Sequence, residues 1–369
     1  MEWGEFRYQT IFNKIVQGRR LKKDDQISGE IPFVMAGVTN TGVVNYISNP
    51  VASFPQNSIT VDIFGNVFYR DYDFGAGDDT GVYWSDEKKY SREAMLFFTI
   101  SMQKSLSRKF SFGNKLRSSK SLDFTMKLPI RDGAIDFDFM ENFIAKLEAD
   151  RIAVLEAYLI ATGLKDYTLN DDEQAALAGL NDVNWRMFKI EDVLVWQKGI
   201  SELNPLHLDS LSISDEKKYP FYGQATVNNG IINYRHLNDD VLNNKLSKPT
   251  ILIHSNNQNT VYLEAPFYLK DGHGATSVLQ SEKLDNMNVH FIISSIQKVI
   301  LEKFAYNNKA TKIALKNTEI SLPIKSDNTP DYDFMGCLIS ATQKLVIKDV
   351  CIYAENKAEV NNGIVEVTE

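Results

Sequence analysis

Polar and apolar residues alternate over short stretches in each half of the chain, a pattern that is typical of half-buried β-strands. Residues 58–64 (SITVDIF) alternate in this way and are followed by a Gly-Asn turn signal. Residues 250–254 (TILIH) form a similar run, and Ser-Asn-Asn follows it. Glycine and asparagine are the residues that reverse the chain between strands. We therefore expect a strand-rich region in each half.

A helical pattern follows each strand-rich region, after Leu-Pro-Ile at residues 128–130 and 322–324. Asp136 and Asp331 are placed to cap these helices. The apolar positions have the three-to-four spacing of one helical face; they are Met140, Phe143, Ile144, Leu147, Val154, Leu155 and Tyr158, and then Met335, Leu338, Ile339, Leu345, Val346 and Val350. We expect two long helices whose apolar stripes pack on each other or on a partner.

The two halves repeat each other. Residues 107–115 align without a gap on residues 301–309, and four residues recur: Lys109, Phe110, Asn114 and Lys115 as Lys303, Phe304, Asn308 and Lys309. Further blocks match in the same order, namely 103–104 with 297–298, 128–130 with 322–324, 136–140 with 331–335, and 39–46 with 227–234. Several separated blocks in one order indicate an internal duplication.

These patterns predict an α+β fold with two tandem domains of mixed β-sheet and helices. Each domain is followed by a long helix, and the two helices pack as an antiparallel spacer. The expected boundaries are 1–137 for the first domain, 138–183 for the first spacer helix and an acidic connector, 184–332 for the second domain, and 333–369 for the second spacer helix and the C-terminal tail. Asp171 opens a short capped helix in the connector, which is either an exposed linker or a docking site for a basic partner.

Composition supports folded material, because 43% of the 369 residues are hydrophobic and 11% are aromatic. No apolar run approaches the roughly 18 residues that a membrane span requires, and the N-terminus lacks a signal-peptide pattern. We expect a cytoplasmic protein without membrane contact. The two cysteines, Cys337 and Cys351, exclude a disulfide framework and are expected to be small buried residues.

The net charge of −8 is unusual for a DNA-binding protein, but the charges are segregated. Residues 104–131 contain eight basic residues and one acidic residue, whereas residues 132–184 contain twelve acidic and three basic residues. The field of the surface that meets a phosphate backbone matters more than the total charge. The acidic total therefore does not exclude a nucleic-acid partner.

The sequence offers little chemistry for catalysis. All five histidines lie in the second half, and none has the spacing of a metal or catalytic motif. There is no P-loop, dinucleotide fingerprint or methyltransferase motif. Asp71, Asp73, Asp78 and Asp79 surround glycines, but their spacing fits turns better than a calcium loop. We expect no catalytic residue, no metal site and no cofactor in this chain.

The remaining pattern consists of basic side chains and amide side chains, and both kinds can bind DNA. Basic residues around the two Lys-Phe blocks can neutralise phosphates, and the alternative is a solvated helix face; they are Lys104, Arg108, Lys109, Lys115, Arg117 and Lys120, then Lys298, Lys303, Lys309, Lys312 and Lys316. Arg19, Arg20, Lys22 and Lys23 form another basic cluster. Amide and hydroxyl side chains in two loops can bond base edges or form hairpin turns; they are Thr39, Asn40 and Thr41, then Gln224, Thr226, Asn228 and Asn229.

The chain resembles the specificity subunits of type I and type IIB restriction-modification systems. The local features that carry the resemblance are residues 29–34 (GEIPFV) leading to Ala36-Gly37, residues 57–61 (NSITV), residues 68–74 (FYRDYDF), and Leu128-Pro129 before a long helix. The likeness spans nearly the whole chain. Its individual motifs are short, so their order and duplication carry the specificity.

The resemblance implies that each half is a target-recognition domain for one half of a bipartite, asymmetric DNA site, with the helices as a spacer. A DNA adenine methyltransferase subunit, possibly fused to a nuclease, would dock on the chain and bring S-adenosylmethionine. The chain itself would be non-catalytic. Two other functions remain open: a stand-alone tandem DNA-binding module, acting as a regulator or decoy, and a duplicated carbohydrate- or protein-interaction protein.

Overall fold

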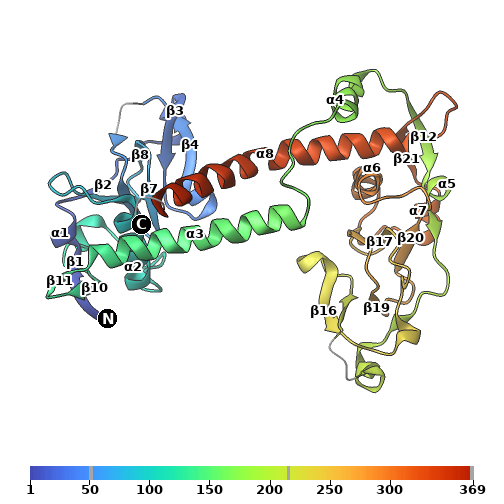
Figure 1. Ribbon diagram of the computed structural model, residues 1–369, viewed down its shortest axis with the longest axis horizontal. Helices are drawn as coiled ribbons and strands as arrows, with labels where there is room; N and C mark the ends of the chain where they lie inside the picture. The colour runs from blue at the N-terminus through green and yellow to red at the C-terminus, as the bar shows by residue number, and fades with distance from the viewer. Residues whose placement is uncertain (50–52, 214–216, 366–369) are drawn as a thin grey trace. The chain divides into compact units, whose positions relative to one another are not determined.

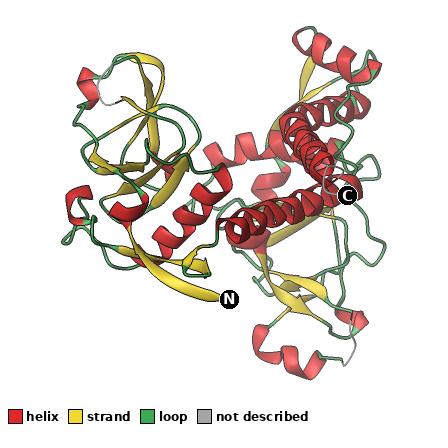
Figure 2. Ribbon diagram, turned by 60° about the vertical axis from the view of Figure 1, so that its left-hand side comes forward, coloured by secondary structure: helices red, strands yellow, loops and turns green. Residues whose placement is uncertain are grey.

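The computed structural model describes residues 1–49, 53–213 and 217–365 (Figure 1), so the last four residues of the predicted tail lie outside it. The chain forms two compact units. Unit 1 consists of Met1–Tyr158 and the segment from Ala354 onward, and unit 2 consists of Leu159–Tyr353. Helices and strands occur in both units (Figure 2), which confirms the α+β prediction.

Three sheets form unit 1. In spatial order they are β2(Lys14–Gln17)-β9(Thr80–Trp84)-β6(Ser58–Asp62)-β7(Val67–Arg70), β4(Val43–Ile47)-β3(Ser28–Val34)-β8(Phe74–Ala76)-β5(Ser53–Phe54), and β1(Glu2–Arg7)-β10(Thr125–Arg131)-β11(Ala134–Ile135). The pair β3–β8 is parallel, and the other pairs are antiparallel. The strand predicted from residues 58–64 is confirmed as β6.

Unit 2 repeats this topology. Its sheets are β13(Val195–Trp196)-β20(Thr276–Gln280)-β17(Thr250–His254)-β18(Thr260–Leu263), β16(Ile231–Arg235)-β15(Tyr219–Tyr222)-β19(Tyr268–Lys270)-β14(Glu202–Leu203), and β12(Trp185–Lys189)-β21(Glu319–Pro323). The parallel pair recurs as β15–β19. Two edge strands differ. β14 precedes β15 and runs parallel to β19, whereas β5 follows β4 and runs antiparallel to β8, and β11 has no counterpart beside β21 among the described strands. The duplication is therefore a property of the fold as well as of the sequence.

The ladder registers relate the two units residue by residue. In unit 1 Ser58 pairs with Arg70, and in unit 2 Thr250 pairs with Leu263. The next pair in each ladder also corresponds, because an isoleucine is paired with a tyrosine in both: Ile59 with Tyr69 and Ile251 with Tyr262. Arg70 and Leu263 thus occupy equivalent positions.

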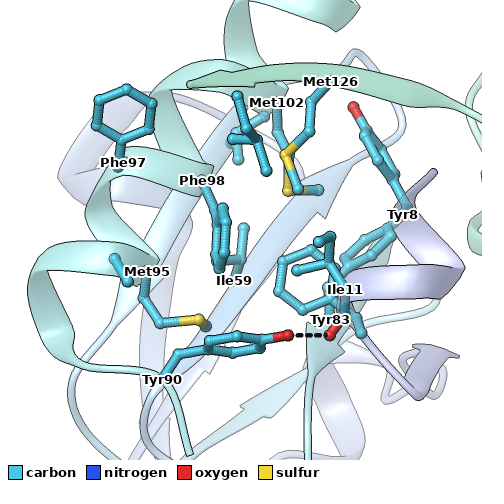
Figure 3. Packing of buried hydrophobic residues seen from close by; sticks show 14 of the residues in the cluster. Tyr8, Ile11, Ile59, Tyr83, Tyr90, Met95, Phe97, Phe98, Met102 and Met126 are labelled. Carbon is cyan, nitrogen blue, oxygen red and sulfur yellow. Dashed lines mark hydrogen bonds between the residues drawn. The ribbon is translucent and has the colours of Figure 1, made fainter. Parts of the chain in front are cut away.

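A helix packs on the central sheet of each unit: α2(Arg92–Leu106) in unit 1 and α6(Asn288–Lys303) in unit 2. Figure 3 shows part of the unit 1 core, where Met95, Phe98 and Met102 of α2 lie against Ile59 and Tyr83 of the sheet. Isoleucines of α6 are buried in the same way. Short helices complete the units, namely α1(Tyr8–Ile11), α5(Ile190–Val193) and α7(Lys312–Lys316).

The two long helices are α3(Phe137–Ala161) and α8(Tyr332–Val365). Asp136 accepts a hydrogen bond from the Phe139 backbone N–H, and Asp331 from that of Phe334, so both predicted caps are confirmed. The apolar stripes are buried only at their beginnings, at Met140, Ile144 and Met335. Farther along, several of the predicted stripe residues are exposed: Phe143, Leu147, Val154, Tyr158, Leu345, Val346 and Val350. No helix within the described ranges is long and apolar enough to cross a bilayer.

The acidic connector is attached to α8 within unit 2. Its helix α4(Asp171–Ala178) has a capping box on Asn170, as the sequence predicts for a capped helix here. Glu173 of α4 is only 3% exposed and accepts hydrogen bonds from Ser340 and Lys344 of α8, at 2.6 and 2.9 Å. Farther back along the connector, the Leu164 carbonyl lies 3.4 Å from Cys351 Sγ. Glu173 thus fixes the connector to α8, although most of the connector's other residues are exposed.

The contacts between the connector and α8 occur in the order expected of two antiparallel segments. Leu164 meets Cys351, Thr168 meets Lys344, and Glu173 meets Ser340, so residue numbers rise on one side as they fall on the other. Within unit 1, Lys357 near the end of α8 lowers the pKa of Glu148 of α3, although Arg92 is the larger cause. These contacts agree with the predicted antiparallel spacer.

Replacing Glu173 with alanine should loosen the connector. Burial alone would raise the pKa of this carboxyl, but hydrogen bonds from Ser340, the Asn170 backbone and Lys344 outweigh it and lower the pKa. A depressed pKa stabilises the fold above the ordinary value of 4.5 and loses this effect as the pH falls. We expect E173A to cost about 3 kcal/mol, as for a broken buried pair, measured by urea denaturation at pH 7. The exposed neighbour Asp172, replaced with alanine, should cost less than about 1 kcal/mol; equal losses would contradict the assignment.

Candidate nucleic-acid interface

Each unit has a hairpin whose turn holds two consecutive residues in the left-handed region. In unit 1, η2(Thr39–Gly42) joins β3 to β4, with Asn40 at φ 46° and Thr41 at φ 51°. In unit 2, η6(Val227–Gly230) joins β15 to β16, with Asn228 at φ 49° and Asn229 at φ 51°. A buried glycine at positive φ follows in both. A Cβ on Gly42 would lie 2.7 Å from the Met35 carbonyl oxygen, so only glycine fits.

The first asparagine of each turn stabilises the turn itself. Asn40 Nδ2 donates to the Val43 carbonyl at 3.4 Å, and Asn228 Nδ2 donates to the Ile231 carbonyl at 3.2 Å. An asparagine that reads adenine must use both its amide N–H and its oxygen. Asn40 and Asn228 therefore act first as turn residues, whereas the exposed Asn229 has no side-chain hydrogen bond within the described part of the chain.

Arg70 lies under the unit 1 turn and holds it. Its side chain is 2% exposed and donates to the Thr41 hydroxyl at 3.1 Å and to the Thr41 carbonyl at 2.6 Å. Thr60 and Tyr72 accept two further hydrogen bonds, and the guanidinium lies 5.3 Å from the Phe68 ring centroid. Burial lowers the pKa of Arg70. Among the described residues no carboxylate forms a salt bridge with it, so hydroxyl and carbonyl oxygens solvate the charge.

The two turns need different support because their second residues differ. A β-branched residue at positive φ is strained, and Thr41 is such a residue. Asparagine adopts this region at little cost, and Asn229 stands at the corresponding position in unit 2. The ladder position of Arg70 is occupied in unit 2 by Leu263, an apolar core residue that has no hydrogen-bonding side chain. The unit 1 turn is therefore held by an arginine, whereas the unit 2 turn has an asparagine at the corresponding left-handed position and a leucine at the ladder position of Arg70.

Amide side chains support the unit 2 hairpin from the neighbouring loop. Asn256 Nδ2 donates to Gln224 Oε1 at 2.5 Å, and Asn257 Nδ2 donates to the Gln224 carbonyl at 2.9 Å. Asn259 Nδ2 donates to the Ala225 carbonyl at 2.9 Å. Gln224, which the sequence suggests as a base-reading residue, thus has its side-chain oxygen engaged within the protein. Thr226 and Thr39 are exposed at the edges of the two turns.

The two Lys-Phe blocks have the same structure. After α2, Ser111 and Asn114 pair as a tight two-residue turn, and after α6, Ala305 and Asn308 do the same. Each turn is closed by an equivalent side-chain hydrogen bond at 3.0 Å: Asn114 Nδ2 donates to the carbonyl of Lys109, three residues after α2 ends, and Asn308 Nδ2 donates to that of Lys303, the last residue of α6. The sequence predicts the repeat but not the turn, since the alternation expected of a hairpin is missing.

Most predicted phosphate ligands are free of carboxylate partners. Within the described ranges, none of the following forms a salt bridge: Arg19, Arg20, Lys22, Arg108, Lys109, Lys115, Arg117, Lys120, Lys303, Lys309, Lys312 and Lys316. Cations elsewhere are paired, for example Arg92 with Glu148 and Arg131 with Asp136. Lys316 and Lys303 are partly engaged, the first against the Trp196 ring and the second by Thr318.

Two hollows show which of these residues lie together. In unit 1, a hollow of about 700 Å³ is lined by Arg20, Lys22 and Lys23 together with Asn45 and Asp78. Arg117 reaches the rim of this hollow, since its Nη1 lies 2.5 Å from the Asp78 carbonyl. In unit 2, a hollow of about 470 Å³ is lined by residues that include Asn256, His273, Lys309 and Lys312. Each hollow therefore joins predicted cations to an asparagine that the sequence did not single out, Asn45 in unit 1 and Asn256 in unit 2, and none of the predicted amide and hydroxyl residues lines either hollow.

The residues expected to have no catalytic role show ordinary structural environments. His254 is fully buried, with Nδ1 2.9 Å from the Thr276 hydroxyl, and burial lowers its pKa to about 4. Asp73 accepts a hydrogen bond from the Gln56 backbone N–H, which joins two segments of unit 1, and Asp79 accepts one from its neighbour Thr80. The described part of the chain contains no group of three or more residues that could hold a metal ion. Both cysteines are free, and only Cys351 is fully buried.

Comparison with known proteins agrees with this architecture. Residues 1–157 and 182–348 each match the family described as type I restriction modification DNA specificity domain. A curated relative from Heyndrickxia coagulans, the specificity subunit S.BcgI of a type II restriction enzyme, is 20% identical over 338 residues, which is 89% of either protein. The crystal structure of a type I restriction-modification S subunit from M. genitalium has a TM-score of 0.62 and 13% identity, covering 100% of this chain and 95% of that one.

The fold defines a protein with two equivalent domains, each of which carries the same hairpin turn and the same Lys-Phe block. The chain belongs to the family of type I restriction-modification DNA specificity proteins and carries the family domain in two copies. It is a DNA specificity subunit with two target-recognition domains, the non-catalytic component of a restriction-modification system. This membership favours the first of the three functions that the sequence left open.

Replacing Arg70 with leucine, the residue at the equivalent position in unit 2, should release the unit 1 turn. Several hydrogen bonds to buried oxygens are lost, so we expect a cost of about 2–4 kcal/mol in stability. If the unit 1 turn contacts DNA, sequence preference should relax in one part of the target only. Selection of bound sequences from a random library measures this. Unchanged preference in both parts would contradict the positioning role of Arg70.

Proposed function

We propose that each unit reads one part of a bipartite, asymmetric site in double-stranded DNA. The observation that carries this proposal is the pair of equivalent turns on equivalent scaffolds, whose exposed residues differ between the units. Thr39, Asn40 and Thr41 stand in one turn, and Asn228 and Asn229 in the other. Because different side chains make different contacts with base edges, the two units recognise different sequences.

Cations beside these turns supply the affinity that does not depend on sequence. Phosphate contacts orient a protein on the duplex and account for the salt dependence of its binding. The basic residues of the Lys-Phe blocks and of the cluster at residues 19–23 are exposed and free of salt bridges within the described ranges. An ion-paired cation would first have to leave its carboxylate. The unpaired cations of each unit are therefore suited to bind phosphate.

Helix α8 offers a docking surface for a methyltransferase subunit. Leu345, Val346, Val350 and Tyr353 of α8 are exposed. Exposed apolar side chains in such numbers on one helix are typical of protein interfaces. The boundaries 1–137, 138–183, 184–332 and 333–369 are proposed as the functional division between recognition domains and this spacer.

The partner brings the chemistry. We assign the transfer of a methyl group to adenine, and the S-adenosylmethionine that supplies it, to the methyltransferase subunit, which can be fused to a nuclease. This chain contributes the choice of sequence and the distance between its two parts. Such a complex acts in the cytoplasm, where bacterial DNA lies.

Expression of the chain together with an adenine methyltransferase subunit from the same genome, followed by sequencing of methylated DNA, tests the proposal. We expect adenine methylation in a split motif with two defined parts and an undefined gap of fixed length. A continuous motif would contradict the two-unit division. Methylation that is unchanged when this chain is omitted would remove its role as the specificity subunit.

Replacing Lys115 with alanine should weaken binding to all sequences alike. Each lost phosphate contact lowers the slope of log affinity against log salt by about 0.9. Titration of duplex DNA at several salt concentrations measures the slope. Lys248, which is paired with Glu282, provides the matched control, and its alanine variant should keep the slope. An unchanged slope for both K115A and K109A would show that the Lys-Phe blocks do not contact phosphate.

A further inference from the structure

The tight turn in each Lys-Phe block holds one aromatic residue away from the protein. Phe112 occupies the tip of the unit 1 turn and is 80% exposed, and Tyr306 occupies the tip of the unit 2 turn and is 78% exposed. Single exposed apolar residues are common on protein surfaces and need no explanation. Here, however, an aromatic ring is exposed at the same position of two duplicated turns.

Both turns are rigidly attached. The Ser111 and Asn114 backbones exchange two hydrogen bonds of 3.1 and 3.0 Å, and those of Ala305 and Asn308 exchange two of 3.0 Å. On the far side, the Leu116 N–H donates to the Ile63 carbonyl at 2.9 Å, and the Ala310 N–H donates to the Ser255 carbonyl at 3.1 Å. Each ring therefore projects from a turn that is fixed to its helix and to the central sheet.

A lysine accompanies each ring. Lys115 Nζ lies 4.5 Å from the centroid of Phe112, and Lys309 Nζ lies 5.6 Å from that of Tyr306. The pairing of aromatic ring and lysine persists, although Ser111 has become Ala305 and Gly113 has become Asn307. If the two turns had only a structural role, the exposed ring could have been replaced without cost. Its presence in both turns is better explained if both rings bind the same kind of ligand.

We propose that Phe112 and Tyr306 insert against a base step of duplex DNA and unstack it, while the adjacent lysine binds the neighbouring phosphate. Proteins that bend DNA use apolar wedges of this kind, and aromatic rings also stack on bases without sequence preference. This inference rests on the proposed function and adds to it: each half of the target is deformed at one step as well as read at base edges.

Charge favours DNA over a protein partner as the occupant. Lys115 lies over the first ring, and Arg108, Lys109 and Arg117 are within five residues of Phe112 in the sequence; none of these four forms a salt bridge in the part of the chain that the structure describes. Lys309 lies over the second ring and lines one hollow together with Lys312. An exposed ring with an unpaired lysine against it, in a basic segment, matches a polyanion that also presents π-faces.

The experiment uses the chain assembled with its methyltransferase and a duplex carrying the methylated motif. Adenines are replaced one at a time by 2-aminopurine, whose fluorescence rises when it is unstacked. We expect a rise at one step in each half of the target. F112A should abolish the rise in one half and Y306A in the other, with a loss of affinity of about 5- to 150-fold. The salt slope should not change, because no charge is removed.

Two control variants separate a wedge from a loss of structure. F112L keeps an apolar wedge and should retain most of the affinity and the fluorescence rise. Ile100, an exposed residue of α2, should tolerate alanine without effect on either. The inference is overturned if F112A and Y306A keep the rise and the affinity, or if they instead lose the methyltransferase during purification.

The outcome also separates this inference from the proposed function. If the unsubstituted complex binds its motif in a salt-dependent way but gives no rise at any position, only the insertion fails. If it shows no preference for the motif, the proposed function and the insertion fail together.

Discussion

Two consecutive left-handed residues at each hairpin tip are the constraint on which the recognition surface depends. This geometry brings the turn side chains to the surface, and it is strained for any residue other than glycine, asparagine or aspartate. Where the second residue is Thr41, a buried arginine supplies hydrogen bonds that hold it. Where it is Asn229, the ladder position equivalent to Arg70 is a leucine. In unit 1 the turn residue Thr41 and the buried Arg70 therefore depend on each other, which limits the substitutions that this turn can accept.

The duplicated scaffold around these turns is similar in both units. Its charged residues fall into two groups, those that are ion-paired and those that are not. Paired ions such as Arg92–Glu148 and Lys344–Glu173 stabilise the contacts of the long helices and the connector. Cations near the turns remain unpaired among the described residues. The net charge of −8 therefore does not describe the surface that DNA would meet.

Periodicity, caps and internal repeats predict the α+β class, the long helices and the two-domain plan, because these are local signals of the chain. Arg70 could not be found in this way, since its role depends on a turn nearly 30 residues away that only the folded sheets bring close. The aromatic tips were aligned as Phe112 and Tyr306, but their exposure follows from the turn geometry. Likewise, the engagement of Gln224 depends on Asn256 in another loop.

Hydroxyl-radical footprinting of the complex of this chain with its methyltransferase tests the central claim most directly. Two equivalent units that each bind one stretch of duplex should protect two separate segments, divided by a gap in which the backbone stays accessible. The F112A and Y306A variants should each weaken protection in a different segment. One continuous protected segment that responds to both variants alike would contradict the account.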